Sequence, residues 1–134
     1  MYSKAILFLY AIIYFMEKFT IHQISNFTGL SVHTLRYYEK IGLLNRVDRD
    51  ANGYRQYTES DISWINFLIR LRVTGMPISE MKQFSDLRSQ GDSTISLRRE
   101  LLENHQKNVL EQIKDLQNNL FKIEEKINYY KGLE

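Results

Sequence analysis

The C-terminal part of the chain carries the feature that most restricts its fold, a long stretch with an apolar repeat every seven residues. Neither Pro nor Gly occurs in residues 93–131, which predicts one helix of about 58 Å at a rise of 1.5 Å per residue. Apolar residues recur there as at positions a and d of a heptad. The predicted a and d residues are Leu102, Val109, Ile113, Leu116, Leu120, Ile123, Ile127 and Tyr130.

The apolar stripe of this predicted helix is narrow for its length. A narrow stripe on a long helix indicates packing against another helix instead of a globular core. The rest of the sequence offers no second helix of similar length, so we expect residues 93–131 to form a coiled coil with a second copy of the chain. The alternative is that this helix folds back on the helices predicted before it. A melting temperature that depends on protein concentration would favour the dimer.

The front half of the chain predicts two short helices. Residues Thr20–Gln23 have the pattern of a capping box, and the helix that they begin is expected to end at Gly29. Ser31 is placed to begin a second helix, and Gly42 to end it. Two short helices joined by a turn that contains Gly are typical of a helix-turn-helix.

A small hairpin is predicted after these two helices. The dipeptide Asn52-Gly53 indicates a tight type I′ turn. It is flanked by Val47 and by residues Tyr54–Tyr57, whose side chains follow the period of two that is typical of a strand. We therefore expect a two-stranded wing beside the second helix.

Two further helices are predicted between the wing and the heptad helix. Thr58 is placed to cap the first, Gly75 to end it, and Pro77 is tolerated at the start of the next. The apolar positions of the first are predicted to be Ile62, Ile65, Leu68, Ile69 and Val73, with Trp64 and Phe67 widening the stripe. Aromatic residues and Met at helical spacing usually form core, but a small effector pocket is the alternative for Trp64, Phe67, Met76, Met81 and Phe84.

Cations and phenols are concentrated in the stretch Leu30–Tyr57. A short helix and a tight hairpin with such side chains suit a charged, grooved surface, and duplex DNA is our hypothesis for that surface. The net charge is only +2, with 18 Lys and Arg against 16 Asp and Glu. Bulk charge alone therefore does not identify a nucleic acid as the partner.

The composition argues against several other functions. The chain has no Cys and only three His, far apart in the sequence, so we predict no disulfide, no metal site and no cofactor. No nucleophile–base pair or phosphate loop is present, so we predict no catalytic residue and no enzymatic activity. The main rival is a protein-interaction module built on the coiled coil, which would bind duplex DNA with no salt dependence or not at all.

Residues 5–16, AILFLYAIIYFM, form an unbroken apolar run near the N-terminus. The run is too short to cross a bilayer, which takes about 20 residues as a helix. We interpret residues 1–15 as an extension upstream of a natural start at Met16. A membrane or partner anchor and an export signal are the alternatives.

Three segments together resemble the MerR family of bacterial transcription regulators. They are TLRYYEKIGLL (Thr34–Leu44), NGYR (Asn52–Arg55) with Tyr57, and Gly75 before the following helix. The resemblance covers roughly Phe19 to Leu87. It implies a mainly α fold, in which a winged helix-turn-helix DNA-binding domain (residues 16–88) precedes a dimerisation helix that forms an antiparallel coiled coil (residues 93–131). The chain looks most like the stress- and aldehyde-responsive branch of the family, without the cysteine of that branch.

The resemblance also implies a function. A cytoplasmic homodimer would bind double-stranded promoter DNA, and bend and untwist a spacer that is too long for RNA polymerase. A constitutive DNA bender without an effector is the alternative, and the sequence identifies no effector. Arg46 stands where relatives often have Pro, which predicts a more basic wing entry, and core packing is the alternative role for Tyr57. The implied DNA contacts are His33, Thr34, Arg36, Tyr37, Lys40, Arg49, Tyr54, Arg55 and Tyr57.

Overall fold

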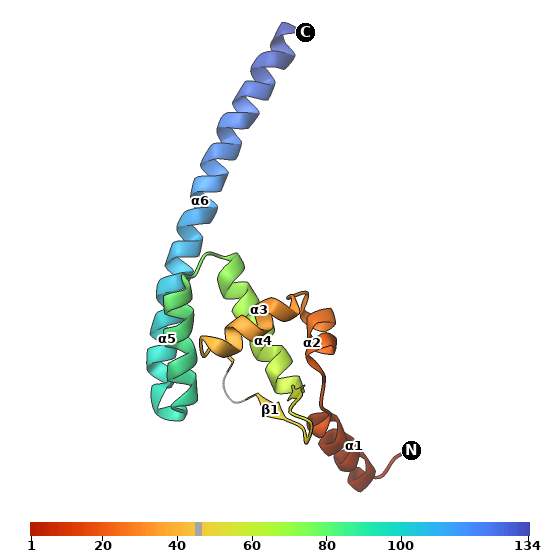
Figure 1. The fold of residues 1–134 in the computed structure, drawn as a ribbon. Helices are drawn as coiled ribbons and strands as arrows, with labels where there is room; N and C mark the ends of the chain where they lie inside the picture. The colour runs from red at the N-terminus through yellow and green to blue at the C-terminus, as the bar shows by residue number, and fades with distance from the viewer. Residues whose placement is uncertain (45–46) are drawn as a thin grey trace.

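The computed structural model describes residues 1–44 and 47–134, without the side chains of residues 13–16. Within these residues the chain forms six α-helices, one short 3-10 helix and one pair of antiparallel strands. Figure 1 shows that the last helix, α6 (Ile95–Leu133), extends far beyond the group formed by the other elements. The prediction of a mainly α fold with a small wing and a long C-terminal helix is confirmed.

Helices α2 (Ile21–Thr28) and α3 (Val32–Lys40) form the predicted helix-turn-helix. The backbone N–H of Gln23 donates to Thr20 Oγ1 at 3.2 Å, and the Thr20 N–H donates to Gln23 Oε1 at 2.8 Å. This reciprocal pair is the expected capping box. Gly29 follows α2 with a φ of 77°, a conformation that favours glycine.

The wing consists of β1 (Asp48–Arg49) and β2 (Arg55–Gln56), paired antiparallel. Its turn differs from the prediction by one residue. The Gly53 N–H donates to the Asp50 carbonyl at 3.0 Å, so the central residues are 51 and 52, and Gly53 follows with a φ of 82°. A three-residue hairpin loop that ends on a left-handed glycine matches this pattern. The predicted effect of Arg46 on the wing entry falls outside the described residues.

Helix α4 (Glu59–Val73) lies at the centre of the core, and its inner face differs from the predicted one. Trp64, Leu68 and Leu71 are buried with Ile65, whereas Val73 is 79% exposed. The inward prediction for Val73 is therefore wrong. Val73 lies nine residues from Trp64, which is two and a half turns of helix, so the two side chains point to opposite sides.

Two hydrogen bonds fix the segment that follows α3 against the later helices. The indole Nε1 of Trp64 donates to the Leu43 carbonyl at 2.8 Å, and the Ser85 hydroxyl on α5 (Ile78–Ser89) approaches the same oxygen at 3.2 Å. The Trp64 ring also stacks on Phe84, with centroids 5.8 Å apart. These contacts hold α3 in one orientation relative to α4 and α5.

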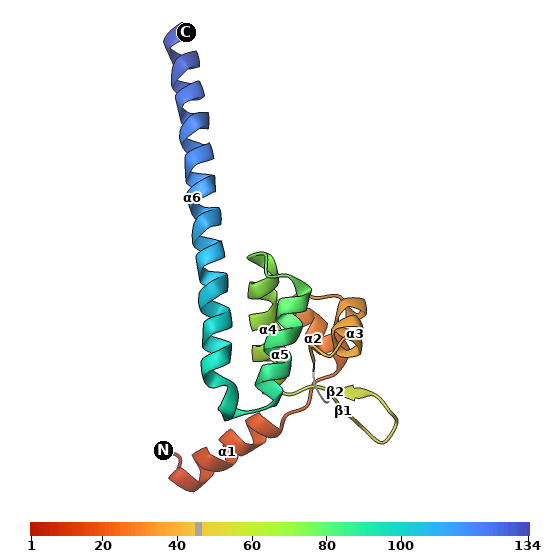
Figure 2. The same ribbon diagram turned by 90° about the vertical axis from the view of Figure 1, so that its left-hand side faces the viewer.

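The first part of α6 packs beside α5, after the 3-10 helix η1 (Asp92–Thr94) reverses the chain (Figure 2). Side chains of α6 also reach the end of α4. Gln112 Nε2 donates to the Thr74 carbonyl at 3.0 Å, and Thr74 Oγ1 lies 2.7 Å from His105 Nε2. The residues of α6 from position 110 onward are all exposed.

The apolar run near the N-terminus forms helix α1 (Lys4–Met16). Leu7, Phe8, Leu9 and Tyr10 are each more than half exposed. In the described part of the chain, no helix combines the length and the apolar character needed to cross a membrane. The assignment of residues 1–15 to an upstream extension stays a prediction.

Candidate nucleic-acid interface

Helix α3 has one buried and one exposed face. Leu35 and Tyr38 are fully buried, which places the side chains between them on the outside. The outward positions His33, Arg36 and Lys40 follow one another at intervals of three and four residues, so they form a single stripe along the helix. Tyr37 is 43% exposed beside this stripe.

Thr34 lies at the first turn of α3 and is only half-buried. Its backbone N–H donates to Ser31 Oγ at 3.1 Å, and the two hydroxyl oxygens are 3.0 Å apart. The Ser31 side chain therefore caps the helix as predicted and also orients the Thr34 hydroxyl.

Arg72, at the end of α4, anchors the other end of α3. Its Nη1 donates to the Tyr38 hydroxyl at 2.8 Å. This hydrogen bond raises the pKa of Arg72 above its ordinary value, so the guanidinium stays charged. Arg72 is exposed, and it adds a cation next to Tyr37 that sequence reasoning did not identify.

Glu39 connects α3 to both strands of the wing. Its Oε1 accepts from Arg49 Nη2 at 3.4 Å, and its Oε2 accepts from Arg55 Nε. Arg49 Nη1 also donates to the Gly53 carbonyl at 2.9 Å, which braces the turn. The wing is thus tied to α3 by one carboxylate and two guanidinium groups.

A slot of about 230 Å³ lies between α2, α3 and the wing turn. Arg36 from α3, Arg55 from β2 and His22 from the first turn of α2 all line it. The Phe19–Tyr57 bridge, with N–H to carbonyl distances of 2.7 and 2.8 Å, holds the start of α2 beside the wing. The slot is lined by Thr20, Ile21, His22, Arg36, Gly53, Tyr54 and Arg55.

Tyr57 requires a correction. The sequence placed it among the DNA contacts, but its side chain is fully buried, and its hydroxyl has no hydrogen-bond partner in the described residues. Because its backbone pairs with Phe19, the ring points into the core. The alternative of a packing residue is the one that the structure supports.

The cluster considered as an effector pocket also requires a correction. Trp64, Met76, Met81 and Phe84 are buried members of the core, and Phe67 packs on Phe84 with ring centroids 5.6 Å apart. These side chains fill space against one another, so core packing is the role that the structure supports.

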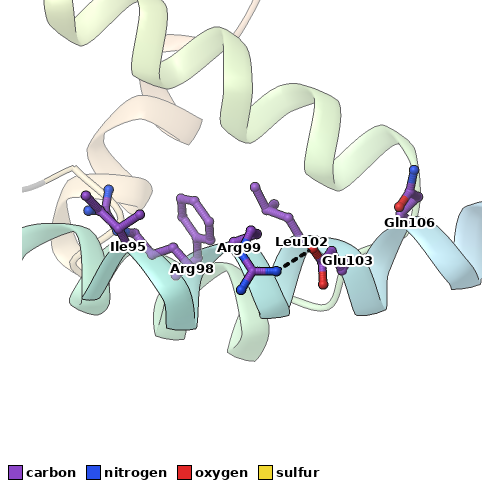
Figure 3. A pocket seen from close by; sticks show the side chains of 7 residues that line it. Ile95, Arg98, Arg99, Leu102, Glu103 and Gln106 are labelled. Carbon is purple, nitrogen blue, oxygen red and sulfur yellow. Dashed lines mark hydrogen bonds and ion pairs between the residues drawn. The ribbon is translucent and has the colours of Figure 1, made fainter. Parts of the chain in front are cut away.

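A groove does lie beside this cluster, on the outer side of Phe84. It has a volume of about 520 Å³ and runs along the first turns of α6. Figure 3 shows Ile95 and Leu102 among the side chains that line it, together with the ion pair between Arg99 and Glu103. The groove continues the apolar stripe of α6, because Leu102 belongs to both.

The predicted dimerisation residues fall into two groups. Leu102 and Val109 are half-buried against the same chain, where the helix does fold back on earlier elements. The other six are 45–68% exposed: Ile113, Leu116, Leu120, Ile123, Ile127 and Tyr130.

The sequence placed Arg36, Tyr37 and the wing arginines on this surface, but it gave no sign of other residues that belong there. Arg72 and Tyr38 are 34 residues apart, and no local pattern links them. Thr20 was identified only as a helix cap. Its position beside the wing depends on the Phe19–Tyr57 pairing, which a periodicity argument does not reveal.

Family models match most of this surface. A model described as MerR HTH family regulatory protein matches residues 19–87, and one described as MerR, DNA binding matches residues 62–125. The first interval coincides with the stretch on which the sequence resemblance rests.

Curated relatives cover much of the same region. An uncharacterized HTH-type transcriptional regulator of Haemophilus influenzae is 42% identical over 102 residues, which is 76% of either chain. The HTH-type transcriptional regulator AdhR of Bacillus subtilis is 36% identical over 68% of this chain and 65% of its own.

Solved structures extend the similarity to most of the fold. HiNmlR, described as a MerR family regulator lacking the sensor domain and bound to promoter DNA, is 38% identical with a TM-score of 0.79. This match covers 86% of this chain and 91% of that chain. A MerR family transcriptional regulator from Bacillus thuringiensis has a TM-score of 0.74 at 38% identity, and the match covers 83% and 97% of the two chains.

Proposed function

The chain belongs to the MerR family of HTH regulators, and on that premise we propose that it binds promoter DNA as a homodimer and regulates transcription by reshaping the promoter. Its relative HiNmlR was solved in complex with promoter DNA. The same fold and the cationic stripe on α3 support this role here.

The observation that carries the proposal is the slot between α2, α3 and the wing. Arg36 and Arg55 converge on it from different elements, and guanidinium groups bind phosphate through several parallel hydrogen bonds. In the first turn of α2, the backbone N–H groups of Ile21 and His22 have no hydrogen-bond partner in the described residues, and such groups favour an anion. A backbone phosphate in this slot would place α3 against the major groove.

In this docked arrangement, the position of each outward residue on α3 decides whether it would contact base edges or phosphates. His33 and Thr34 lie near the start of the helix, where base edges are reached in helix-turn-helix complexes. Arg36 is placed for a guanine edge or a phosphate, while Tyr37 and Lys40 lie toward phosphates. Arg49, Tyr54 and Arg55 of the wing extend the contact along the backbone.

The exposed stripe of α6 supports dimerisation of residues 93–131. Full burial of a large apolar side chain contributes roughly 1.5–3 kcal/mol. The six side chains are 45–68% exposed, and a second copy of the helix would cover this exposed surface. Leu116 lies midway between Leu102 and Tyr130, so an antiparallel pair centred there would match the two stripes end to end. A pair of this kind would also bring the end of the partner helix to the groove beside Phe84.

Dimerisation would set the distance between the two DNA-binding domains. Two domains (residues 16–88) at a fixed separation would contact two half-sites of one duplex. Bending a site of 20–30 base pairs costs about 1–6 kcal/mol, which contacts distributed over both half-sites would offset. The reshaped spacer would then suit RNA polymerase, the partner that the family implies, and a cytoplasmic location follows from that role.

Replacing Arg36 tests this proposal. Genomic fragments captured by the wild-type protein supply a binding duplex, and fluorescence anisotropy at fixed salt measures its Kd. Arg36→Ala is expected to weaken binding by about 1–3 kcal/mol, because a base or phosphate contact is lost.

Lys107→Ala is the matched control. Lys107 is exposed on α6, away from the heptad stripe, and its removal changes the net charge by the same amount. Binding should stay close to wild type in this variant. Equal Kd values for Arg36→Ala and the wild type would contradict the docking of α3 on DNA.

A further inference from the structure

The carboxylate of Glu39 occupies an unexpected place for an acidic side chain. It lies in the last turn of α3, where the helix dipole disfavours negative charge. It also lies on the surface assigned above to a polyanion. Two local penalties therefore act against an acid at this position, and compensating contacts are required to stabilise it.

Those contacts come from the two wing arginines. Both oxygens of Glu39 accept from a guanidinium group, Arg49 on one side and Arg55 on the other. Only 22% of the Glu39 side chain and 22% of the Arg55 side chain are exposed, so this ion pair is screened less than one in open solvent.

The wing itself needs this carboxylate. Arg49 and Arg55 are direct partners in the β1–β2 register, and like charges opposite each other destabilise a strand pair. The strands have only two residues each, so few backbone hydrogen bonds oppose this repulsion. Glu39 lies between the two cations and neutralises part of it.

The arrangement leaves specific donors available. Glu39 accepts a hydrogen bond from Nε of Arg55. In the described part of the chain, the two Nη groups of Arg55 have no hydrogen-bond partner. A guanidinium held by its Nε presents its remaining N–H groups in one fixed direction. For Arg55, one of the residues that line the slot, these are the donors that a phosphate requires.

We infer that Glu39 is a positioning residue that fixes the wing arginines for phosphate contact and thereby sets the specificity of DNA binding. The inference rests on the proposed function. Glu39 repels every duplex to a similar degree through its charge, whereas the orientation of Arg55 helps only when α3 is seated in its correct site. Glu39 therefore lowers the affinity for non-specific DNA and raises the affinity for the specific site.

Glu39→Gln is the informative substitution, because it keeps the shape of the side chain. An amide has one acceptor oxygen and one donor nitrogen, so it can serve only one of the two arginines, and its charge is gone. Anisotropy should be measured at one salt concentration with the captured genomic duplex and with a shuffled duplex of equal length. We expect the ratio of specific to non-specific affinity to fall by about tenfold or more, with the non-specific affinity unchanged or higher.

Asp48→Asn is the matched control. Asp48 is the neighbour of Arg49 on β1, its side chain is 71% exposed, and it pairs only with Lys18 at 3.8 Å in the described residues. This variant loses one negative charge, as Glu39→Gln does, from a residue next to Arg49, without releasing an arginine. Both affinities should rise together, and their ratio should stay at the wild-type value.

Glu39→Asp separates charge from geometry. The shorter carboxylate keeps the charge but cannot span both arginines, so the ratio should fall while the non-specific affinity stays constant. Wild-type ratios in both Glu39 variants, or a Glu39→Gln variant that raises both affinities equally, would overturn the inference. A wild-type protein that does not distinguish the two duplexes would instead contradict the proposed function.

Discussion

At the scale of single residues, Tyr57 was predicted from the sequence to contact DNA, whereas the structure buries its side chain in the core. Its hydroxyl is buried without a partner in the described residues. Burial, followed by the charge of Glu39, raises the pKa of Tyr57 to about 12. The phenol is therefore neutral at physiological pH, and its ionisation opposes folding.

Stability at alkaline pH tests this placement. The pKa of Tyr57 in the folded state lies above the unfolded value of about 10. The contribution of the neutral phenol to folding stability is therefore full below pH 10 and is lost as the pH rises through about 12. Between these values the wild type should lose of the order of 2 kcal/mol relative to Tyr57→Phe. Urea unfolding of both proteins across this range measures the difference. Parallel pH profiles would contradict the burial of the hydroxyl.

The sequence predicted Arg36 and Lys40 as DNA contacts, and both side chains lie on the exposed face of α3. Their contact with DNA stays a prediction. Tyr57 was misplaced, because alternation in a short strand does not say which face is covered. The face is decided by Phe19, far away in the sequence.

At the scale of elements, the wing turn has a strict conformational requirement. Gly53 has a φ of 82°, and a Cβ added there would meet no atom within 4 Å. The cost of a side chain is therefore conformational alone, about 1–2 kcal/mol. Because the strands are so short, this strain would fall mainly on the wing.

Gly53→Ala is accordingly expected to weaken binding to the captured duplex by several-fold in anisotropy, with a smaller change in melting temperature. Gly132→Ala, in the last turns of α6 and with no atom within 4 Å of the added Cβ, is the control and should leave binding unchanged. Wild-type affinity in Gly53→Ala would show that the wing does not contact DNA.

Element boundaries were predictable because the capping residues specify them locally. Thr20, Ser31 and Thr58 each begin a helix as expected. The inner face of α4 was less predictable, since its apolar residues surround much of the helix. Its orientation follows from the Trp64–Phe84 stack and the hydrogen bond to Leu43, which are tertiary contacts.

At the scale of the whole molecule, the exposed stripe of α6 determines the quaternary structure that we propose. Leu116 lies at its centre and is 68% exposed. Leu116→Glu would place a charge in the middle of the coiled coil, where it would be buried without a partner. We expect sedimentation analysis to give a monomer of 16.0 kDa for this variant and twice that mass for the wild type.

Lys114→Glu provides the comparison, because Lys114 lies outside the a and d positions of the same helix. It should remain dimeric and should bind the captured duplex more tightly than Leu116→Glu. A wild-type protein that sediments as a monomer at micromolar concentration would contradict the dimer.

The salt dependence of DNA binding tests the central claim most directly, since it reports how many phosphates the protein neutralises. If each copy contributes three of its cations, such as Arg36, Arg49 and Arg55, a dimer makes six phosphate contacts. The slope of log K against log salt concentration for the captured duplex should then be about −5 or steeper. A slope near zero would contradict the DNA interface and favour a protein-interaction module built on α6.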